Sequence, residues 1–85
     1  MKDFSGRIAV ITGGGTGMGR ALARQLVAEG CDVAMCDVSA ANMAESIALC
    51  EAEAPQGVRT TSFVCDVSDA PQMDAFAEHV QSAFD

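Results

Sequence analysis

The sequence from Thr12 to Gly19 is TGGGTGMG, a glycine-rich turn on which the fold prediction rests. The preceding residues 7–12, RIAVIT, hold an uninterrupted apolar run, which is typical of a strand buried on both faces. After the turn, apolar residues recur at helical spacing. Glycine adopts a positive φ without steric cost, and it lets an anion approach the free N–H groups at a helix N-terminus. A glycine-rich turn between a strand and a helix is therefore typical of a phosphate-binding site.

The rest of the sequence repeats this alternation. Two further strands are predicted at residues 32–36 and 58–65, since both segments are apolar and rich in β-branched residues. Helices are predicted from Gly17 to a C′ glycine at Gly30, from Ser39 as N-cap to just before Pro55, and from Ser68 or Asp69 onward with Pro71 in the first turn. This order predicts an α/β fold, a Rossmann-type βαβαβα half with a parallel three-stranded sheet, as in a truncated doubly wound fold. Right-handed crossovers then place the first two helices on the same face of the sheet.

The spacing of apolar residues also predicts which side of each helix is buried. The stripes are Met18, Leu22 and Leu26 in the first helix; Met43, Ile47, Cys50 and Ala54 in the second; and Met73, Phe76, Ala77, Val80 and Phe84 in the third. Arg20 and Arg24 are assigned to a solvated helix face and His79 to a helix surface.

The tetrapeptide Cys-Asp-Val-Ser occurs twice, at residues 36–39 and 65–68, each time where a strand gives way to a helix. Both copies therefore place an aspartate, Asp37 or Asp66, at the carboxyl end of a parallel strand. Open α/β sheets bind ligands at that edge. The repeat favours one shared binding edge.

The spacing of the glycines distinguishes between several known nucleotide-binding motifs. A P-loop requires Lys and then Ser or Thr after its last glycine, but Arg20-Ala21 follows Gly19. The G-x-G-x-x-G pattern begun at Gly15 requires a third glycine at position 20, which is Arg20. The pattern that fits is Thr-Gly-x-x-x-Gly-x-Gly, met by Thr12, Gly13, Gly17 and Gly19.

In this spacing the sequence resembles the short-chain dehydrogenase/reductase family. The opening segment, residues 4–14, is similar to the family's first strand, and Asp66-Val67 resembles its adenine-pocket pair. The resemblance implies an oxidoreductase that transfers hydride between a nicotinamide dinucleotide and a small alcohol or carbonyl substrate. It also implies a homo-oligomer.

The resemblance assigns a role to each candidate site residue. Residues lining the pyrophosphate and adenosine ribose would be Gly13, Thr16, Gly17, Met18 and Gly19. Asp37 would accept hydrogen bonds from the ribose hydroxyls and repel a 2′-phosphate, and Val38 would cover the adenine. Asp66, next to Val67, would accept a hydrogen bond from the adenine amino group. Thr16 stands where relatives that prefer NADP often carry a basic residue, so NAD is the expected cofactor and NADP the less favoured one.

The family's catalytic groups are absent from these 85 residues. Its chemistry needs a tyrosine acid/base whose pKa a nearby lysine lowers. This chain has no tyrosine, and its one lysine, Lys2, precedes the first strand. We therefore expect residues 1–85 to be the N-terminal part of a single NAD(P)-binding domain, inactive alone, with the catalytic half elsewhere in a parent enzyme. Asp69 is expected to be a helix cap. Thr12 as a plain strand residue, and Asp37 and Asp66 as plain loop carboxylates, remain alternatives.

Two other functions compete with a dehydrogenase. An S-adenosylmethionine-dependent methyltransferase also uses a glycine-rich turn after its first strand, but Ile11 stands where its usual acid would be, and Thr12 with Gly19 is then unexplained. The third interpretation is a non-catalytic dinucleotide-binding module.

Composition excludes several classes of partner. A net charge of -7 argues against nucleic acid and anionic membrane surfaces, which require clustered Lys and Arg. No apolar run approaches the roughly 20 residues of a membrane helix, and the start lacks the apolar stretch of a signal peptide, so a cytoplasmic location is expected. The four cysteines, which form no Cys-x-x-Cys pair, and the single histidine predict no metal site and reduced thiols.

Overall fold

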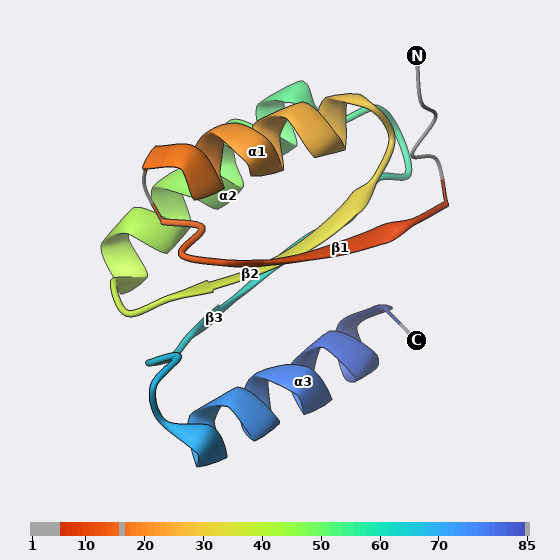
Figure 1. Cartoon of the computed structure of the whole chain (residues 1–85). Helices are drawn as coiled ribbons and strands as arrows, with labels where there is room; N and C mark the ends of the chain where they lie inside the picture. The colour runs from red at the N-terminus through yellow and green to blue at the C-terminus, as the bar shows by residue number, and fades with distance from the viewer. Residues whose placement is uncertain (1–5, 16, 85) are drawn as a thin grey trace.

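The computed structural model describes residues 6–15 and 17–84, along which strands and helices alternate. Their order is β1 (Ile8–Thr12), α1 (Gly17–Ala28), β2 (Asp32–Asp37), α2 (Ala40–Glu53), β3 (Thr60–Val64) and α3 (Ala70–Phe84). The strands are parallel and lie in the order β1-β2-β3, with α1 and α2 on one face of the sheet and α3 on the other (Figure 1). The predicted Rossmann-type α/β fold is confirmed, as is the shared face of the first two helices.

Hydrogen bonds at the helix ends explain why α1 and α2 end and begin near the predicted residues. Gly30, with φ of 92°, donates its N–H to the Val27 carbonyl at 3.0 Å, and Cys31 donates to Leu26 at 3.0 Å. This pair of bonds is a Schellman motif, which stops a helix at a left-handed glycine. At the start of α2, Oγ of Ser39 accepts the N–H of residue 42 at 3.1 Å, as an N-cap does.

The third strand and helix begin slightly later than predicted. The N–H of Val58 donates to the Pro55 carbonyl at 3.2 Å in a turn that contains Gly57 at φ 91°, so β3 begins only at Thr60. Asp69 accepts the N–H of residue 72 at 3.2 Å, which makes Asp69 the N-cap and starts α3 one residue further on. The prediction that Asp69 is a helix cap is thus confirmed.

One core lies between the sheet and the helices α1 and α2. Its fully buried members include Val33 and Met35 from β2 and Met43 from α2. From α1 the core takes Ala23 and Val27, whereas the predicted stripe was wrong at its first two positions, since Met18 is 89% and Leu22 48% exposed. Ala23 and Val27 thus form the sheet side of α1, and Leu26 packs beside them, whereas Met18 and Leu22 lie outside this core.

A second core lies between the sheet and α3. It contains Ala34, Cys36, Cys65 and Phe76, with Phe63, Met73, Val80 and Phe84 packed around them. Two predictions for α3 were wrong. Ala77 is exposed, one position outside the buried stripe. His79 is half-buried rather than on the surface, because its ring packs on Phe63 and its Nε2 lies 2.7 Å from Oγ1 of Thr61.

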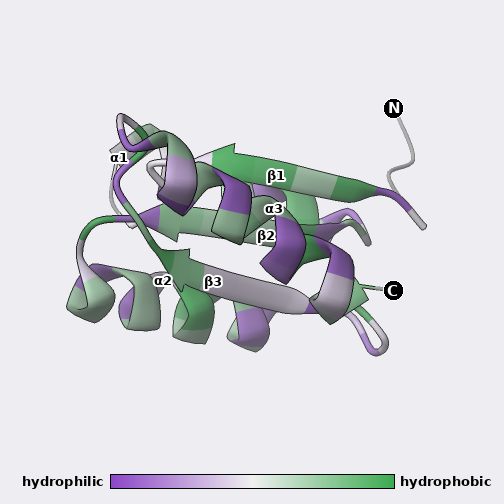
Figure 2. Cartoon of the chain, turned by 90° about the horizontal axis from the view of Figure 1, so that it is seen from below, coloured by the Kyte–Doolittle hydropathy of each residue, from purple (hydrophilic) through white to green (hydrophobic). Residues whose placement is uncertain are grey.

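On the α3 face of the sheet, this second core covers β2 and β3 but does not cover β1. Ile8 is 48% and Val10 56% exposed, although both are apolar. Figure 2 shows β1 as a largely hydrophobic strand at one edge of the sheet. None of the helices in the described ranges is long and apolar enough to cross a membrane.

Candidate functional site

The carboxyl ends of the three strands meet at a hollow of about 240 Å³. It is lined by Thr12, Gly13, Asp37, Val38, Cys65, Asp66 and Val67. Both Cys-Asp-Val-Ser segments therefore lie at one edge of the sheet, as their positions in the sequence predicted. That this edge binds a ligand remains a prediction.

The glycine-rich turn bends over the end of β2. Gly13 and Gly14 donate their N–H groups to the Cys36 carbonyl at 2.8 and 3.1 Å. Gly13 has a φ of 75° and Gly17 a φ of 59°, a backbone region that side chains disfavour. A Cβ added at either of these two glycines would meet no atom of the described residues within 4 Å, so these residues leave the space in front of the turn open. Thr16, the other predicted turn residue, lies outside the described residues.

Helix α1 begins directly behind this turn, at Gly17. Its first N–H groups have no partner within the helix, and the helix dipole favours an anion there. A Cβ at Gly19 would lie 2.8 Å from the carbonyl carbon of Gly13 and would collide with its oxygen. Gly19 is thus required for close packing of α1 on the turn, while the neighbouring Met18 points into solvent.

Asp37 joins the end of β2 to the turn. Its Oδ2 accepts the N–H of Gly15 at 2.9 Å, and its Oδ1 accepts the N–H of Val38 at 2.6 Å. These two bonds fix the orientation of the carboxylate. Because each carboxylate oxygen can accept more than one hydrogen bond, acceptor capacity remains on both oxygens for a ligand.

Asp66, the aspartate of the second Cys-Asp-Val-Ser segment, lies two residues beyond the end of β3. Its Oδ1 accepts hydrogen bonds from Oγ of Ser68 at 2.7 Å and from the N–H of Ser68 at 2.9 Å. These bonds hold the pKa of Asp66 below its usual value, so the carboxylate is ionised at neutral pH and acts only as an acceptor. Val38 and Val67 flank the hollow with 67% and 54% of their surface exposed, which leaves apolar side chains free to cover a flat ring.

Two residues that were not predicted as part of the site, Arg20 and Ser46, hold the turn from behind. The prediction that Arg20 belongs to a solvated face was wrong: its side chain is only 18% exposed, and its guanidinium donates to the Gly15 carbonyl at 2.5 Å. Ser46 of α2 is fully buried and donates to the Gly14 carbonyl at 2.7 Å. A signal was present, since Ser46 lies in the apolar row between Met43 and Cys50. Arg24, in contrast, is half-exposed, with 43% of its side-chain surface accessible.

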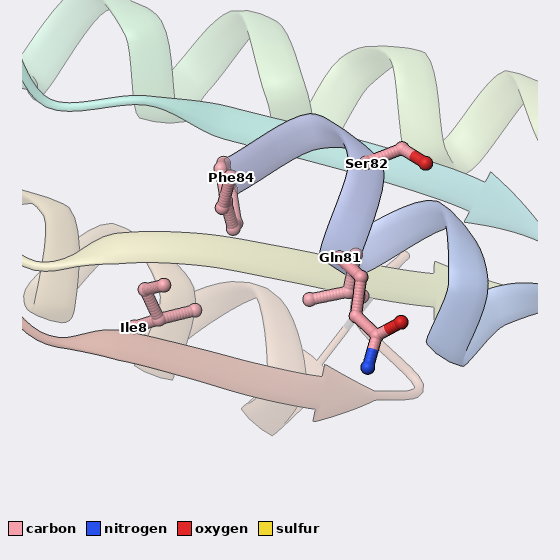
Figure 3. A pocket seen from close by; sticks show the side chains of 5 residues that line it. Ile8, Gln81, Ser82 and Phe84 are labelled. Atoms are coloured by element: carbon pink, nitrogen blue, oxygen red, sulfur yellow. The ribbon is translucent and has the colours of Figure 1, made fainter.

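A larger hollow, of about 600 Å³, lies away from the turn. Its lining comprises Ile8, Val80, Gln81, Ser82 and Phe84, and Figure 3 shows Ile8 and Phe84 pointing into the space between β1 and α3. These residues carry no charged group. Within residues 6–15 and 17–84, no cluster of three His, Cys, Asp or Glu side chains is placed to hold a metal ion, and the four cysteines are buried free thiols. The strand-end hollow is therefore the better candidate site.

Comparison with known proteins gives the family. Residues 7–85 match the family model described as short chain dehydrogenase. Levodione reductase from Leifsonia aquatica is 40% identical over 81 residues, which are 95% of this chain and 30% of that protein. The chain thus spans less than a third of that relative's length.

Two solved structures share the fold and differ in cofactor. A short-chain dehydrogenase/reductase from Burkholderia phymatum in complex with NAD has a TM-score of 0.87 at 33% identity, covering 99% of this chain and 29% of that one. L-Sorbose reductase from Gluconobacter frateurii, complexed with NADPH and L-sorbose, has a TM-score of 0.86 at 32% identity, covering 96% and 30%. The methyltransferase interpretation finds no support, and the chain belongs to the short-chain dehydrogenase/reductase family.

Proposed function

We propose that this chain is the first part of a NAD-binding domain in a longer short-chain oxidoreductase. The whole protein would transfer hydride between NAD and the alcohol or carbonyl group of a small substrate. Two observations support the proposal: the family match over residues 7–85, and a carboxylate from β2 held against an open glycine turn. The catalytic groups would come from outside these residues.

The residues at the strand ends fit a dinucleotide. The pyrophosphate would lie at the N-terminus of α1 against the backbone of Gly13, Thr16, Gly17, Met18 and Gly19, where an anion is favoured. The open space in front of Gly13 and Gly17 leaves room for it. The adenosine would lie over the strand-end hollow, with Asp37 at the ribose, Asp66 at the adenine amino group, and Val38 and Val67 at the adenine faces. When bound, the nicotinamide supplies the hydride chemistry.

NAD rather than NADP is the proposed cofactor, and Asp37 is the reason. Solved relatives carry NAD or NADPH, so family membership alone does not decide between them. A carboxylate fixed by Gly15 and Val38 would bind the two ribose hydroxyls and would repel a 2′-phosphate. A cytoplasmic location and a homo-oligomeric assembly belong to the same proposal.

The test compares the two cofactors on the full-length protein that carries this segment. Equilibrium titration with NADH and NADPH should give an affinity for NADH at least about tenfold higher, because the phosphate must lie beside a carboxylate. Tighter binding of NADPH would contradict the NAD assignment. Binding without turnover of any alcohol or carbonyl in a broad panel would instead favour a non-catalytic dinucleotide-binding module.

A further inference from the structure

A polar cluster, which we call the Arg20–Ser46 cluster, lies between α1 and α2 directly behind the glycine turn. Nε of Arg20 donates to Oγ of Ser46 at 2.8 Å, and the hydroxyl of Ser46 donates to the carbonyl of Gly14 at 2.7 Å. The guanidinium also donates to the carbonyls of Gly15 and Asn42, at 2.5 and 3.1 Å, and forms an ion pair with Glu45. Ser46 is the buried polar residue of the described core.

The cluster fixes the orientation of one peptide group in the turn. The carbonyl of Gly14 accepts from Ser46 on the α2 side, while the N–H of Gly15, in the same peptide plane, donates to Asp37. A planar peptide bonded at both ends has little freedom to rotate. The next carbonyl, that of Gly15, is held on the same side by Arg20. Neither carbonyl is then free to turn toward the open side, where its negative end would oppose an anion.

We propose that Arg20 and Ser46 are positioning residues for the dinucleotide. They set the backbone of the glycine turn, and through it the affinity for the pyrophosphate and adenosine ribose, without touching the cofactor. This inference rests on the proposed function and extends it, because it assigns part of the binding affinity to side chains on the far side of the turn. Glycines cannot hold the turn by their own side chains, so an external cluster is needed to make it rigid.

Arg24 offers a matched control on the same two helices. It lies one turn further along α1 and pairs with Glu53 of α2, with Nε 2.6 Å from Oε1. That pair also joins α1 to α2, yet it makes no bond to the part of the glycine turn that the structure describes, residues 12–15 and 17–19. Substitution of either arginine would therefore weaken the packing of α1 on α2. Only substitution of Arg20 would also disturb the geometry of the glycine turn.

The experiment measures the affinity for NADH and the thermal midpoint in the full-length protein. Arg20→Gln should weaken NADH binding about tenfold, since one charged donor to the turn is lost. Arg20→Lys should recover part of that loss, because an ammonium group can still donate to the Gly15 carbonyl. Ser46→Ala should weaken binding by a similar factor, and the double variant should show less than the product of the two effects, since both act through one cluster.

Arg24→Gln should change NADH affinity less than about twofold, because an exposed ion pair contributes little. The inference is overturned if Arg20→Gln and Ser46→Ala bind NADH as the wild type does, whatever their thermal midpoints, or if Arg24→Gln weakens binding as much as Arg20→Gln. If the wild-type protein bound neither NADH nor NADPH, the proposed function would fail and the inference with it. The wild-type titration thus distinguishes the two failures.

Discussion

The N–H of Gly15 and the Oδ2 of Asp37 lie 2.9 Å apart in a hydrogen bond that joins the glycine turn to the end of β2. The proposed phosphate-binding turn and the proposed ribose-binding carboxylate are therefore one unit. A residue that reorients either part must also affect the other. Gly15 has room for this bond only because it lacks a side chain, since an added Cβ would lie 2.6 Å from the same oxygen.

Gly15→Ala should shift cofactor preference away from NAD. The new methyl group would also lie 3.0 Å from Cγ of Asp37, so the carboxylate must rotate out of its position. We expect NADH affinity to fall about tenfold and NADPH affinity to fall less, measured by titration of the full-length protein. The same change made together with Asp37→Ala should have little further effect. An equal loss in both backgrounds would show that Gly15 acts independently of Asp37.

Asp37→Ala should relax the preference between NADH and NADPH while the fold is retained. The free energy of unfolding should fall by about 1 kcal/mol, because two hydrogen bonds from Gly15 and Val38 are lost at a partly exposed position. Titration with both cofactors and a thermal melt measure the two effects separately. A variant that melted earlier but kept its cofactor ratio would show that Asp37 is structural only.

Gly19→Ala should destabilise the protein and weaken dinucleotide binding together. The methyl group would collide with the Gly13 carbonyl, which is backbone and cannot rotate away as a side chain could. The expected loss of unfolding free energy is about 2 kcal/mol, as for other overpacked sites. Chemical denaturation with and without NADH measures both quantities. Unchanged stability would mean that α1 can move away from the turn at little cost.

Much of this fold was predictable because its signals are local. Gly30 and Ser39 end and begin their helices through bonds to residues within a few positions, and the strands are continuous apolar runs. The strand-end positions of Asp37 and Asp66 follow from the same local pattern. The roles of these aspartates stay predictions, since hydrogen bonds within the chain do not test ligand binding.

What the sequence did not show depends on contacts between distant elements. Helical periodicity predicts a stripe through Met18 and Leu22, but the core takes Ala23 and Val27 from this helix instead. Arginine side chains are usually exposed to solvent. Only the position of Arg20 opposite Ser46, 26 residues away in the sequence, makes it part of the site. Such pairings are decided by tertiary packing, which local spacing does not encode.

The four cysteine thiols should resist alkylation while the protein is folded. Burial, with the adjacent Cys65 thiol, raises the pKa of Cys36 to about 12, and burial also raises the pKa of Cys31 and Cys50. Iodoacetamide at pH 8 should label none of the four rapidly, and all four after denaturation, by mass spectrometry.

The same raised pKa values predict a loss of stability at high pH. Their contribution to folding is fully present below the unfolded thiol pKa near 9.0 and is lost as the pH rises toward 12. Thermal midpoints measured from pH 7 to 11 should fall above pH 9. Fast labelling of a single native cysteine at pH 8 would contradict the burial on which both expectations rest.

The 85-residue chain made alone should self-associate or be partly molten, with NAD binding weak or undetectable. Among residues 6–15 and 17–84, β1 pairs with β2 alone, so within this part of the chain its other edge carries unpaired N–H and C=O groups. Ile8 and Val10 are about half exposed on the face that α3 leaves bare, and an exposed apolar edge strand is a template for association. Val10→Lys should reduce the association, because a charged edge strand resists pairing. Light scattering measures the self-association, and amide exchange measures how well the β1 amides are protected. A sharp monomer whose β1 amides exchange slowly would contradict the prediction and would show that these residues form a self-sufficient domain.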